Sequence, residues 1–459
     1  MAAVSCGKDD PAPTPDPTPK APTAISLSAS ALTAAQAGQT LSLDVTAPFV
    51  PKLSGAPSWI SVSQGAFSDY KVTLTLVVSA NETYEERSAT VTVTSGTKLS
   101  ATFSVSQGAA EKPDDPTPGE ITQTLVTKNP TDRVQALYQY ICGLYGNKII
   151  SSVMADVNWN HKIADNIGKS TGKYPAMNCY DFIHIYVPKN NWIDYSNLTP
   201  VTEWADAGGI VSLMWHFNVP KTASTTIGTD GSGVTCTPSE TSFRAKNIFT
   251  SASWENKWFY EQMDKVIEVL LALQEKGIPA IWRPFHEAAG NATLKQQASW
   301  ATAWFWWGYD GAEVYKKVWK AMFEYFEQKG VRNLIWVWTT QNFNGNASQY
   351  NQDKDWYPGD AYVDIVARDL YGYNSTQNVT EFSEIQKAYP TKMVTLGECG
   401  KSVPSEGDPI DYARIPELWS AGAKWSWFMP WYGGSLPDDA WWKDAMGSAA
   451  VINRSQVKF

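Results

Sequence analysis

The sequence predicts an α/β protein in which a (β/α)8 barrel, the TIM-barrel fold, follows a small all-β sandwich of the immunoglobulin-like type. Two patterns lead to this prediction. Between residues 23 and 108, short runs alternate in period two and are rich in valine and threonine. Beyond residue 120, near-continuous apolar runs alternate with helical patterns to the end of the chain. A chain of 459 residues is long enough for both units.

The runs LSLDV, YKVTLTLVVS, SATVTVTS and ATFSVSQ predict the strands of the sandwich. This part resembles a BACON domain, a carbohydrate-associated module. The matching motifs are Pro57-Ser58-Trp59-Ile60, a turn at Asn81, Arg87-Ser88-Ala89-Thr90-Val91 and the closing Ser106-Gln107-Gly108. The resemblance implies sugar binding, but a single tryptophan is a small platform. We therefore favour a spacer role for residues 23–108.

Residues 1–22 and 109–119 are rich in proline and aspartate and predict extended linkers. Ala3-Val4-Ser5-Cys6 resembles a bacterial lipobox, whose cysteine becomes lipidated. The following Gly7-Lys8-Asp9-Asp10 resembles the acidic tract of surface lipoproteins in Gram-negative gut bacteria. We expect a secreted outer-membrane surface lipoprotein, trimmed of its leader and anchored through Cys6. An expression-tag scar before a disordered linker is the alternative.

Residues 120–459 predict the barrel. The helical patterns at 255–276 and 312–329 stop at Gly277 and Gly330, as helices commonly do. The predicted strands are residues 148–154, 175–182, 210–217, 279–287, 333–341, 363–371, 393–398 and 423–431.

Composition narrows the classes of function. The net charge of -9 and the pI of about 5.1 argue against nucleic acid or an anionic membrane surface as a partner. The five cysteines are scattered, so neither a zinc site nor a disulfide framework is indicated, and we expect no metal and no cofactor. Of 22 tryptophans, all but Trp59 lie beyond residue 118. Because a flat indole stacks well on a pyranose ring, this excess favours a carbohydrate cleft.

Two strand-end glutamates are the candidate catalytic pair. Glu287 closes the fourth predicted strand and Glu398 the seventh, and reactive groups of such barrels lie at the carboxyl ends of strands. Two carboxyls about 5–5.5 Å apart are the arrangement of a retaining glycosidase. A structural salt bridge is the alternative for either residue alone. Alternation predicts two sets of residues that share a face: Ile281, Arg283, Phe285 and Glu287, and Val394, Leu396 and Glu398.

The barrel half is similar to glycoside hydrolase family 26, the β-mannanase family. The resemblance rests on four motifs: Trp282-Arg283-Pro284-Phe285-His286-Glu287, Trp304-Phe305-Trp306-Trp307-Gly308, Tyr362-Val363-Asp364-Ile365-Val366 and Gly397-Glu398. It implies that Glu287 is the acid/base and Glu398 the nucleophile.

The resemblance also implies substrate-binding positions. His286 would position the acid/base and the sugar, a satisfied core imidazole being the alternative. His216 would belong to the subsite on the non-reducing side of the cut, which Trp304 would line, whereas Trp306 and Trp307 would pack. No third ligand accompanies the two histidines, so a metal role is not indicated.

Further positions surround the predicted nucleophile. Tyr371 would hydrogen-bond Glu398 and keep it ionised, with Asp369 nearby on the sixth strand. Trp431 would form the floor under the reacting sugar. Trp427, which alternation places on the same face of the strand, is the alternative. Arg283 would either stabilise the carboxylates from below or be a buried structural partner.

The sequence therefore predicts a monomeric, retaining, endo-acting β-1,4-mannanase that cleaves mannan, glucomannan or galactomannan. Mixed-linkage β-glucanase and β-1,3-xylanase activities remain alternatives, because the resemblance implies the same catalytic pair for them. A non-catalytic surface glycan-binding protein is the alternative from another class.

Overall fold

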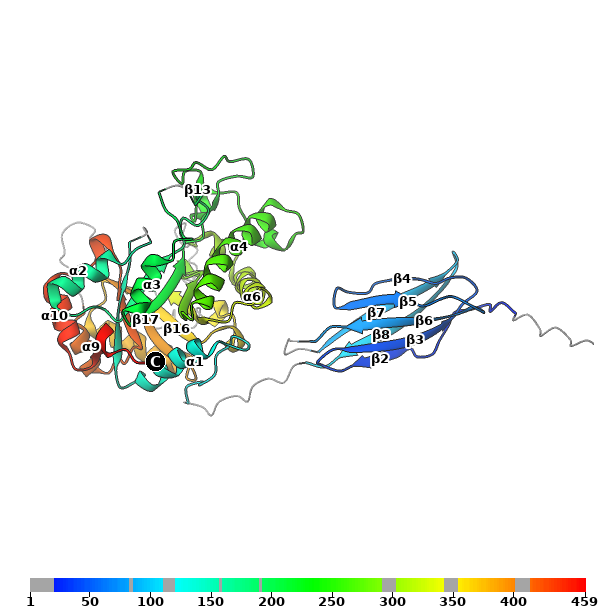
Figure 1. The fold of residues 1–459 in the computed structure, drawn as a ribbon, viewed down its shortest axis with the longest axis horizontal. Coiled ribbons are helices and arrows are strands. Elements are labelled where there is room, and N and C mark those ends of the chain that lie inside the picture. The colour runs from blue at the N-terminus through cyan, green and yellow to red at the C-terminus, as the bar shows by residue number, and fades with distance from the viewer. Residues whose placement is uncertain are drawn as a thin grey trace, which may run out of the picture. The chain divides into compact units, whose positions relative to one another are not determined.

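The computed structural model describes residues 20–81, 86–109, 120–156, 159–189, 192–290, 303–341, 354–400 and 413–459. The chain divides into two compact units, Met1–Asp115 and Pro116–Phe459 (Figure 1). Cys6, with its predicted lipidation, and most of both predicted linkers lie outside the described residues. No helix in the described ranges is long and apolar enough to cross a membrane.

The first unit is the predicted all-β domain. Its two four-stranded sheets run β1-β3-β6-β5 and β2-β8-β7-β4 and share one apolar core. Within β7 and β8 buried residues alternate with more accessible ones, because successive side chains of a strand point to opposite faces. The strands are β1 (Ser26–Leu27), β2 (Ala31–Ala34), β3 (Gln39–Thr46), β4 (Lys52–Ser54), β5 (Ile60–Gln64), β6 (Lys71–Val78), β7 (Arg87–Ser95) and β8 (Leu99–Gln107).

The tryptophan of the first unit is partly covered. The guanidinium carbon of Arg87 lies 4.5 Å from the centroid of the Trp59 ring, and Arg87 also donates hydrogen bonds to the carbonyls of Ser79 and Ala80. A cation held over one face of the indole leaves less of it for a sugar ring.

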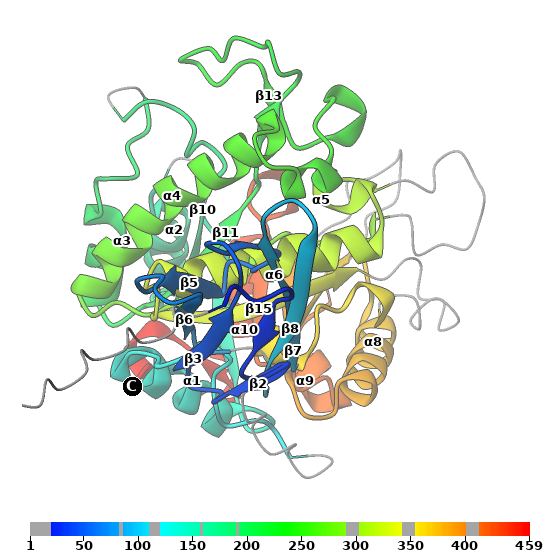
Figure 2. The same cartoon turned by 90° about the vertical axis from the view of Figure 1, so that its right-hand side faces the viewer.

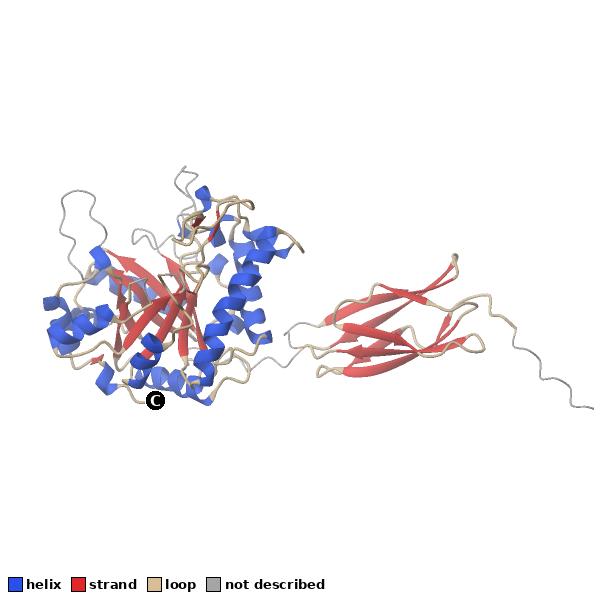
Figure 3. Ribbon diagram, turned by 45° about the horizontal axis from the view of Figure 1, so that its top comes forward, coloured by secondary structure: helices blue, strands red, loops and turns tan. Residues whose placement is uncertain are grey.

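The second unit is the predicted (β/α)8 barrel. All eight predicted strands are present, and all pair in parallel. β9 pairs with both β10 and β18 and thereby closes the ring, which Figure 3 shows from the side. The barrel strands are β9 (Ile149–Met154), β10 (Met177–Asp181), β11 (Ile210–Trp215), β14 (Ala280–Pro284), β15 (Leu334–Gln341), β16 (Ile365–Tyr371), β17 (Met393–Gly400) and β18 (Trp427–Pro430).

Helices surround the ring. The short hairpin of β12 (Val219–Pro220) and β13 (Val234–Thr235) lies in the long connection after β11, and both views show β13 above α4 (Figures 1 and 2). β19 (Val451–Ile452) pairs in parallel with the start of β9. The helices are α1 (Asp132–Leu144), α2 (Lys162–Thr171), α3 (Thr199–Asp206), α4 (Trp254–Glu275), α5 (Trp306–Tyr309), α6 (Ala312–Gln328), α8 (Ser375–Ala388), α9 (Ile415–Ala421) and α10 (Asp439–Gly447).

The barrel has an inner and an outer core. Inward residues such as Ile150, Ile281 and Met393 form one cluster, which the buried face of α1 joins. Outward residues such as Trp282 and Val394 belong to a larger cluster between the strands and the helices. In barrels of this kind the reactive groups lie at the carboxyl ends of the strands.

A buried carboxylate ties the segment before α1 to the barrel. Asp364, 1 % exposed and just before β16, accepts hydrogen bonds from the amides of Val126 and Trp336, each at 2.7 Å. Burial raises the pKa of Asp364 to about 6, while the two amides and Lys392 oppose the rise.

Replacing Asp364 with alanine leaves two amides without their acceptor, so we expect the free energy of unfolding of the barrel to fall by about 2–4 kcal/mol. Urea denaturation followed by tryptophan fluorescence measures this change. Asp206→Ala, at an exposed position, is the control and should alter it by less than about 0.5 kcal/mol. Equal stability of the two variants would contradict the role of Asp364.

Candidate active site

The end of the fourth strand departs from the predicted alternation. β14 stops at Pro284, and the next residues turn, with φ of 47° at Phe285 and 51° at Glu287. Positive φ is costly for residues other than glycine and occurs at functional sites. The prediction that Phe285 shares a face with Ile281 is wrong, because the turn sends its ring into the outer core.

The aromatic segment after the turn holds it in place. Trp307 Nε1 donates to the carbonyl of His286 at 2.9 Å, and the Tyr315 hydroxyl donates to that of Phe285 at 3.2 Å. A Cβ added at Gly308 would lie 1.8 Å from the carbonyl oxygen of Ala288. Trp306 and Trp307 are fully buried, so both pack in the core. The turn that carries Glu287 therefore depends on glycine at position 308.

We expect Gly308→Ala to push this turn away and to lower kcat at least tenfold, since small misplacements of a reacting group are costly. Hydrolysis kinetics on a soluble polysaccharide measure this. Gly143→Ala is the control, because a Cβ there meets nothing within 4 Å and alanine suits the interior of α1. Unchanged kcat in a folded Gly308→Ala variant would contradict this account.

The end of the seventh strand carries a second irregularity. Arg368 pairs with Leu396, whereas the next residue, Asp369, pairs with Glu398, so Gly397 is an extra residue in β17. Such a bulge turns the following side chain to the other face. The prediction that Leu396 and Glu398 share a face is therefore wrong: Leu396 packs outward, and Glu398 meets Arg283 inside the barrel. A Cβ at position 397 would lie 2.6 Å from Asp369 Oδ1, so only glycine fits.

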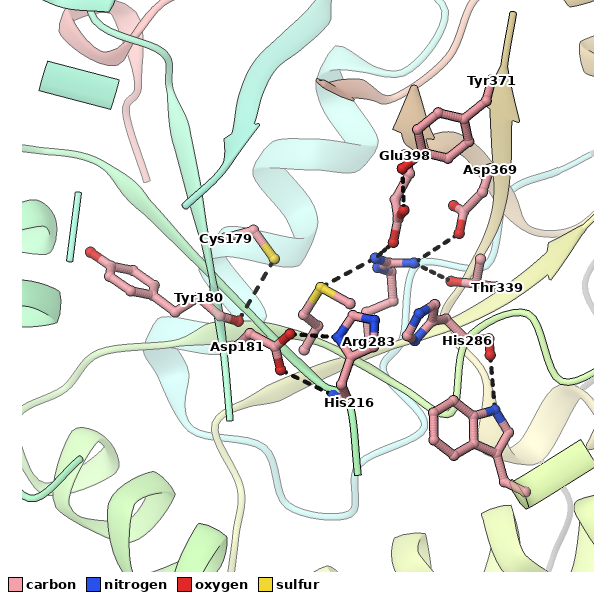
Figure 4. Close-up of polar contacts among 12 residues, drawn as sticks. Cys179, Tyr180, Asp181, His216, Arg283, His286, Thr339, Asp369, Tyr371 and Glu398 are labelled. Atoms are coloured by element: carbon pink, nitrogen blue, oxygen red, sulfur yellow. Dashed lines mark hydrogen bonds and ion pairs between the residues drawn. The ribbon is translucent and has the colours of Figure 1, made fainter. Parts of the chain in front are cut away.

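Arg283 is the centre of the site (Figure 4). Its Nη2 pairs with Glu398 Oε1, and its Nη1 donates to Asp369 Oδ2 at 3.1 Å and to Thr339 Oγ1 at 3.3 Å. Burial opposes the charge of Arg283, but Glu398 and Asp369 outweigh it and raise its pKa. Arg283 therefore remains a cation and stabilises carboxylates that would otherwise be costly to bury.

Glu287 and Asp369 are two buried carboxyls whose pKa values are both raised. Burial, then the negative charges of Asp369 and Glu398, raise the pKa of Glu287 well above its ordinary value, although Arg283 opposes the rise. Burial and then Glu398 likewise raise the pKa of Asp369. Each carboxyl acts on the pKa of the other, as expected for two buried acids that lie close together. One guanidinium cannot balance three buried carboxylates, so the retained proton is the expected outcome.

Glu398 is held by two donors. Besides Arg283, the hydroxyl of Tyr371 donates to Glu398 Oε2 at 2.5 Å, the contact expected from the sequence. Both carboxyl oxygens of Glu398 are therefore engaged, which fixes the orientation of the group.

Two histidines line the site, and their pKa values are shifted in opposite directions. His216 Nδ1 lies 2.5 Å from Asp181 Oδ2; burial opposes protonation, but Asp181 and then Glu398 outweigh it and raise the pKa of His216. Burial, His216 and Arg283 lower the pKa of His286, which is thus neutral. Its Nδ1 is buried without a hydrogen-bond partner among the described residues. A buried polar atom of this kind suits a hydroxyl of a bound ligand.

Aromatic rings stand beside the histidines. Trp431, half-buried after β18, lies 5.8 Å from the His216 ring, whereas Trp427 is buried in the inner core. Phe305 lies 4.9 Å from the His286 ring and stacks on Trp307 at 4.4 Å. Trp304, the neighbour of Phe305, is half-buried.

Sequence reasoning missed Asp181, Thr339 and Phe305. Asp181 ends β10, so its position at a strand end was an available signal. Phe305 lies inside the quoted aromatic motif, but which ring faces the histidines depends on the turn. Within the described part of the chain, no group of three or more histidine, cysteine, aspartate or glutamate residues could hold a metal ion.

The site combines a protonated carboxyl, a second carboxylate held by donors, and aromatic rings around them. The family model described as glycosyl hydrolase family 26 matches residues 126–457. The chain belongs to glycoside hydrolase family 26. The BACON model, described as a putative N-terminal binding domain, matches residues 51–108. This family 26 hydrolase therefore has a BACON domain within its β-sandwich.

Relatives agree with this assignment. The chain is 55 % identical to the family 26 domain of an endo-β-mannanase/endo-β-glucanase from Prevotella bryantii, with a TM-score of 0.71 over 74 % of this chain and 100 % of that one. A β-mannanase from a protist symbiont of the termite Reticulitermes speratus, complexed with a gluco-manno-oligosaccharide, is 29 % identical, with a TM-score of 0.57, over 74 % of this chain and 98 % of that one.

A mannan endo-1,4-β-mannosidase from Thermothelomyces thermophilus is 28 % identical over 70 % of this chain and 60 % of its own length. Two Piromyces enzymes of that name are matched over 48 % and 51 % of their length. The chain thus spans about half to three fifths of these relatives.

In this family 26 hydrolase, Asp369→Asn should lower the pKa of Glu287, because it removes a negative charge that raises this pKa. Glu287 would then lose its proton at a lower pH. We expect the basic limb of kcat/KM to move by about one unit toward acid pH.

The pH profile of polysaccharide hydrolysis measures the shift. Asp364→Asn is a matched control, since this second buried carboxyl lies just before the start of the same strand, away from Glu287. A basic limb that stays in place in Asp369→Asn, or moves equally in both variants, would contradict the effect of Asp369 on the pKa of Glu287.

Proposed function

We propose that this protein is a retaining, endo-acting β-mannanase that cleaves β-1,4-mannosidic bonds by double displacement. The observation that carries the proposal is the contrast between two neighbouring carboxyls. Glu287 has a pKa raised by burial and by two carboxylates, whereas Glu398 accepts hydrogen bonds from Arg283 and Tyr371. A carboxyl that retains its proton can act as the acid, and a neighbouring carboxyl whose two oxygens are held in place can act as the nucleophile.

The reaction proceeds in two steps. Glu398 attacks the anomeric carbon while the glycosidic oxygen leaves with the proton of Glu287, so a covalent glycosyl-enzyme forms. Glu287, now ionised, removes a proton from water, whose oxygen attacks the anomeric carbon and releases Glu398. During the first step negative charge moves from Glu398 to Glu287, and the Arg283 cation lowers the pKa of Glu287 and so favours this charge.

The names of relatives support mannan as the substrate. The relatives from Thermothelomyces, Piromyces and the termite symbiont are all described as mannanases or mannosidases. A β-glucanase activity is the second candidate, because the structure from Prevotella bryantii is described as an endo-β-mannanase/endo-β-glucanase. For the cellular setting we retain the lipoprotein hypothesis, which rests on the motif at Cys6, and a spacer role for the sandwich, which the covering of Trp59 by Arg87 supports.

A panel of polysaccharides tests the proposal. We expect the wild-type protein to release reducing ends from glucomannan and galactomannan, with lichenan a slower substrate and β-1,3-xylan inert. Proton NMR should detect the β-anomer as the first product, since two displacements retain configuration. Initial release of the α-anomer would rule out double displacement, and activity on lichenan alone would favour the β-glucanase.

Replacing Glu398 with alanine should lower kcat at least about a thousandfold, because the covalent intermediate cannot form. Glu287→Ala should lower it about a hundredfold or more on polysaccharide. Glu255→Gln is the control, because Glu255 is 3 % exposed but lies on α4 beside Asn247, away from the site. More than a tenth of wild-type activity in Glu398→Ala would refute its role.

A further inference from the structure

Trp192 differs from the other tryptophans of this protein. It is 47 % exposed, whereas every other tryptophan that the structure describes is buried or half-buried. Tryptophan is strongly buried on average and is enriched at interfaces, so an exposed indole is a candidate contact for a ligand. Trp192 lies in the connection between β10 and α3, on the side of the barrel that carries the reactive groups.

The connection that carries Trp192 is anchored to the wall of the site. It leaves β10 directly after Asp181, the partner of His216. The Tyr195 hydroxyl donates to the carbonyl of Asp181 at 2.9 Å and accepts from the amide of His184 at 3.2 Å. Asn218 Nδ2, from the connection after β11, donates to the carbonyl of Ile183 at 3.0 Å. The position of this connection is therefore set by the same strands that hold His216.

A histidine stands against the exposed indole. The rings of His184 and Trp192 meet edge to face, with centroids 4.4 Å apart. His184 Nδ1 is buried and has no hydrogen-bond partner among the described residues. Burial lowers the pKa of His184, although Asp181 opposes the change, so the ring is neutral near pH 7. A neutral imidazole offers one donor and one acceptor, which suits a sugar hydroxyl.

A second segment borders the same place. Tyr186, whose ring lies 6.2 Å from that of His184, donates from its hydroxyl to the carbonyl of Gly231 at 3.1 Å. The carboxylate of the neighbouring Asp230 is close enough to raise the pKa of Tyr186, after burial. Aromatic surface, an imidazole and a carboxylate thus converge, as they do in sugar sites, which combine an apolar platform with a few polar groups.

We propose that Trp192 and His184 form a distal sugar-binding subsite, which stacks one hexose unit of the polysaccharide beyond His216, away from the cleaved bond. The subsite rests on the proposed function for its ligand class, a β-linked hexose chain. The Trp431 ring meets His216, which pairs with Asp181. The Tyr195 hydroxyl links the backbone of Asp181 to that of His184, whose ring meets Trp192, so these residues form one wall from the reactive carboxyls outward. A chain that fills the centre follows this wall.

The subsite predicts a dependence on chain length. In the Glu398→Gln background, which binds without hydrolysis, Trp192→Ala should weaken the Kd for a hexasaccharide about tenfold and leave that for a disaccharide unchanged. Isothermal titration with β-1,4-manno-oligosaccharides and cello-oligosaccharides of both lengths measures this. Trp192→Tyr keeps a flat ring and should retain most of the hexasaccharide affinity, and His184→Ala should lose several-fold.

Phe249→Ala is the matched control, since Phe249 is also 47 % exposed in this unit but has no role in the proposed wall, and it should leave both affinities unchanged. Three results would overturn the subsite. Trp192→Ala could bind the hexasaccharide as tightly as its parent, it could lose affinity equally for both chain lengths, or the parent could fail to bind the hexasaccharide. Failure of the proposed function gives a different result. If the wild-type protein hydrolyses no mannan but Trp192→Ala still weakens the binding of the longer cello-oligosaccharide, the substrate assignment is wrong and the subsite stands.

Discussion

The structure of the site depends on the ion pairs of Arg283. This one guanidinium contacts Glu398 and Asp369, and the raised pKa values of Asp369 and Glu287 favour a proton retained on this pair. Burying several carboxylates without such compensation would be prohibitively costly. The same arrangement gives the asymmetry that acid/base chemistry needs, because Arg283 and Tyr371 hold Glu398 while the pKa of Glu287 is raised. Charge balance and reactivity therefore have a common origin, and Arg283 supports both of the roles considered for it.

Two local departures from regular strand geometry place these groups. The left-handed turn sets the position of Glu287. The extra residue Gly397 turns Glu398 to the inner face of the barrel, whereas regular alternation would turn it outward. Both depend on glycine at a position where a neighbouring atom leaves no room for a Cβ, namely Gly308 and Gly397. The surrounding aromatic core holds the strained turn by hydrogen bonds to its carbonyls. Strain at the site is thus supported by packing outside it.

Outside the centre, the site extends along the connection after β10. Asp181 links the two parts, since its carboxylate orients His216 and its carbonyl anchors Tyr195. A chain of contacts of this kind lets one strand end position both a residue near the reactive carboxyls and an exposed aromatic ring. Longer polymers can then gain affinity from contacts that do not take part in the reaction.

The sequence by itself determined the two-unit architecture, all eight barrel strands and the family, because apolar periodicity and short motifs are local properties. Arg283, Tyr371 and Glu398 were also predicted as neighbours. Only the tertiary structure decided which way Phe285 and Glu398 face, and that Asp181, Thr339 and Phe305 join the site. A bulge or a positive φ arises from packing against distant segments, and a raised pKa arises from burial and the sum of nearby charges. Neither is written in the local pattern of residues.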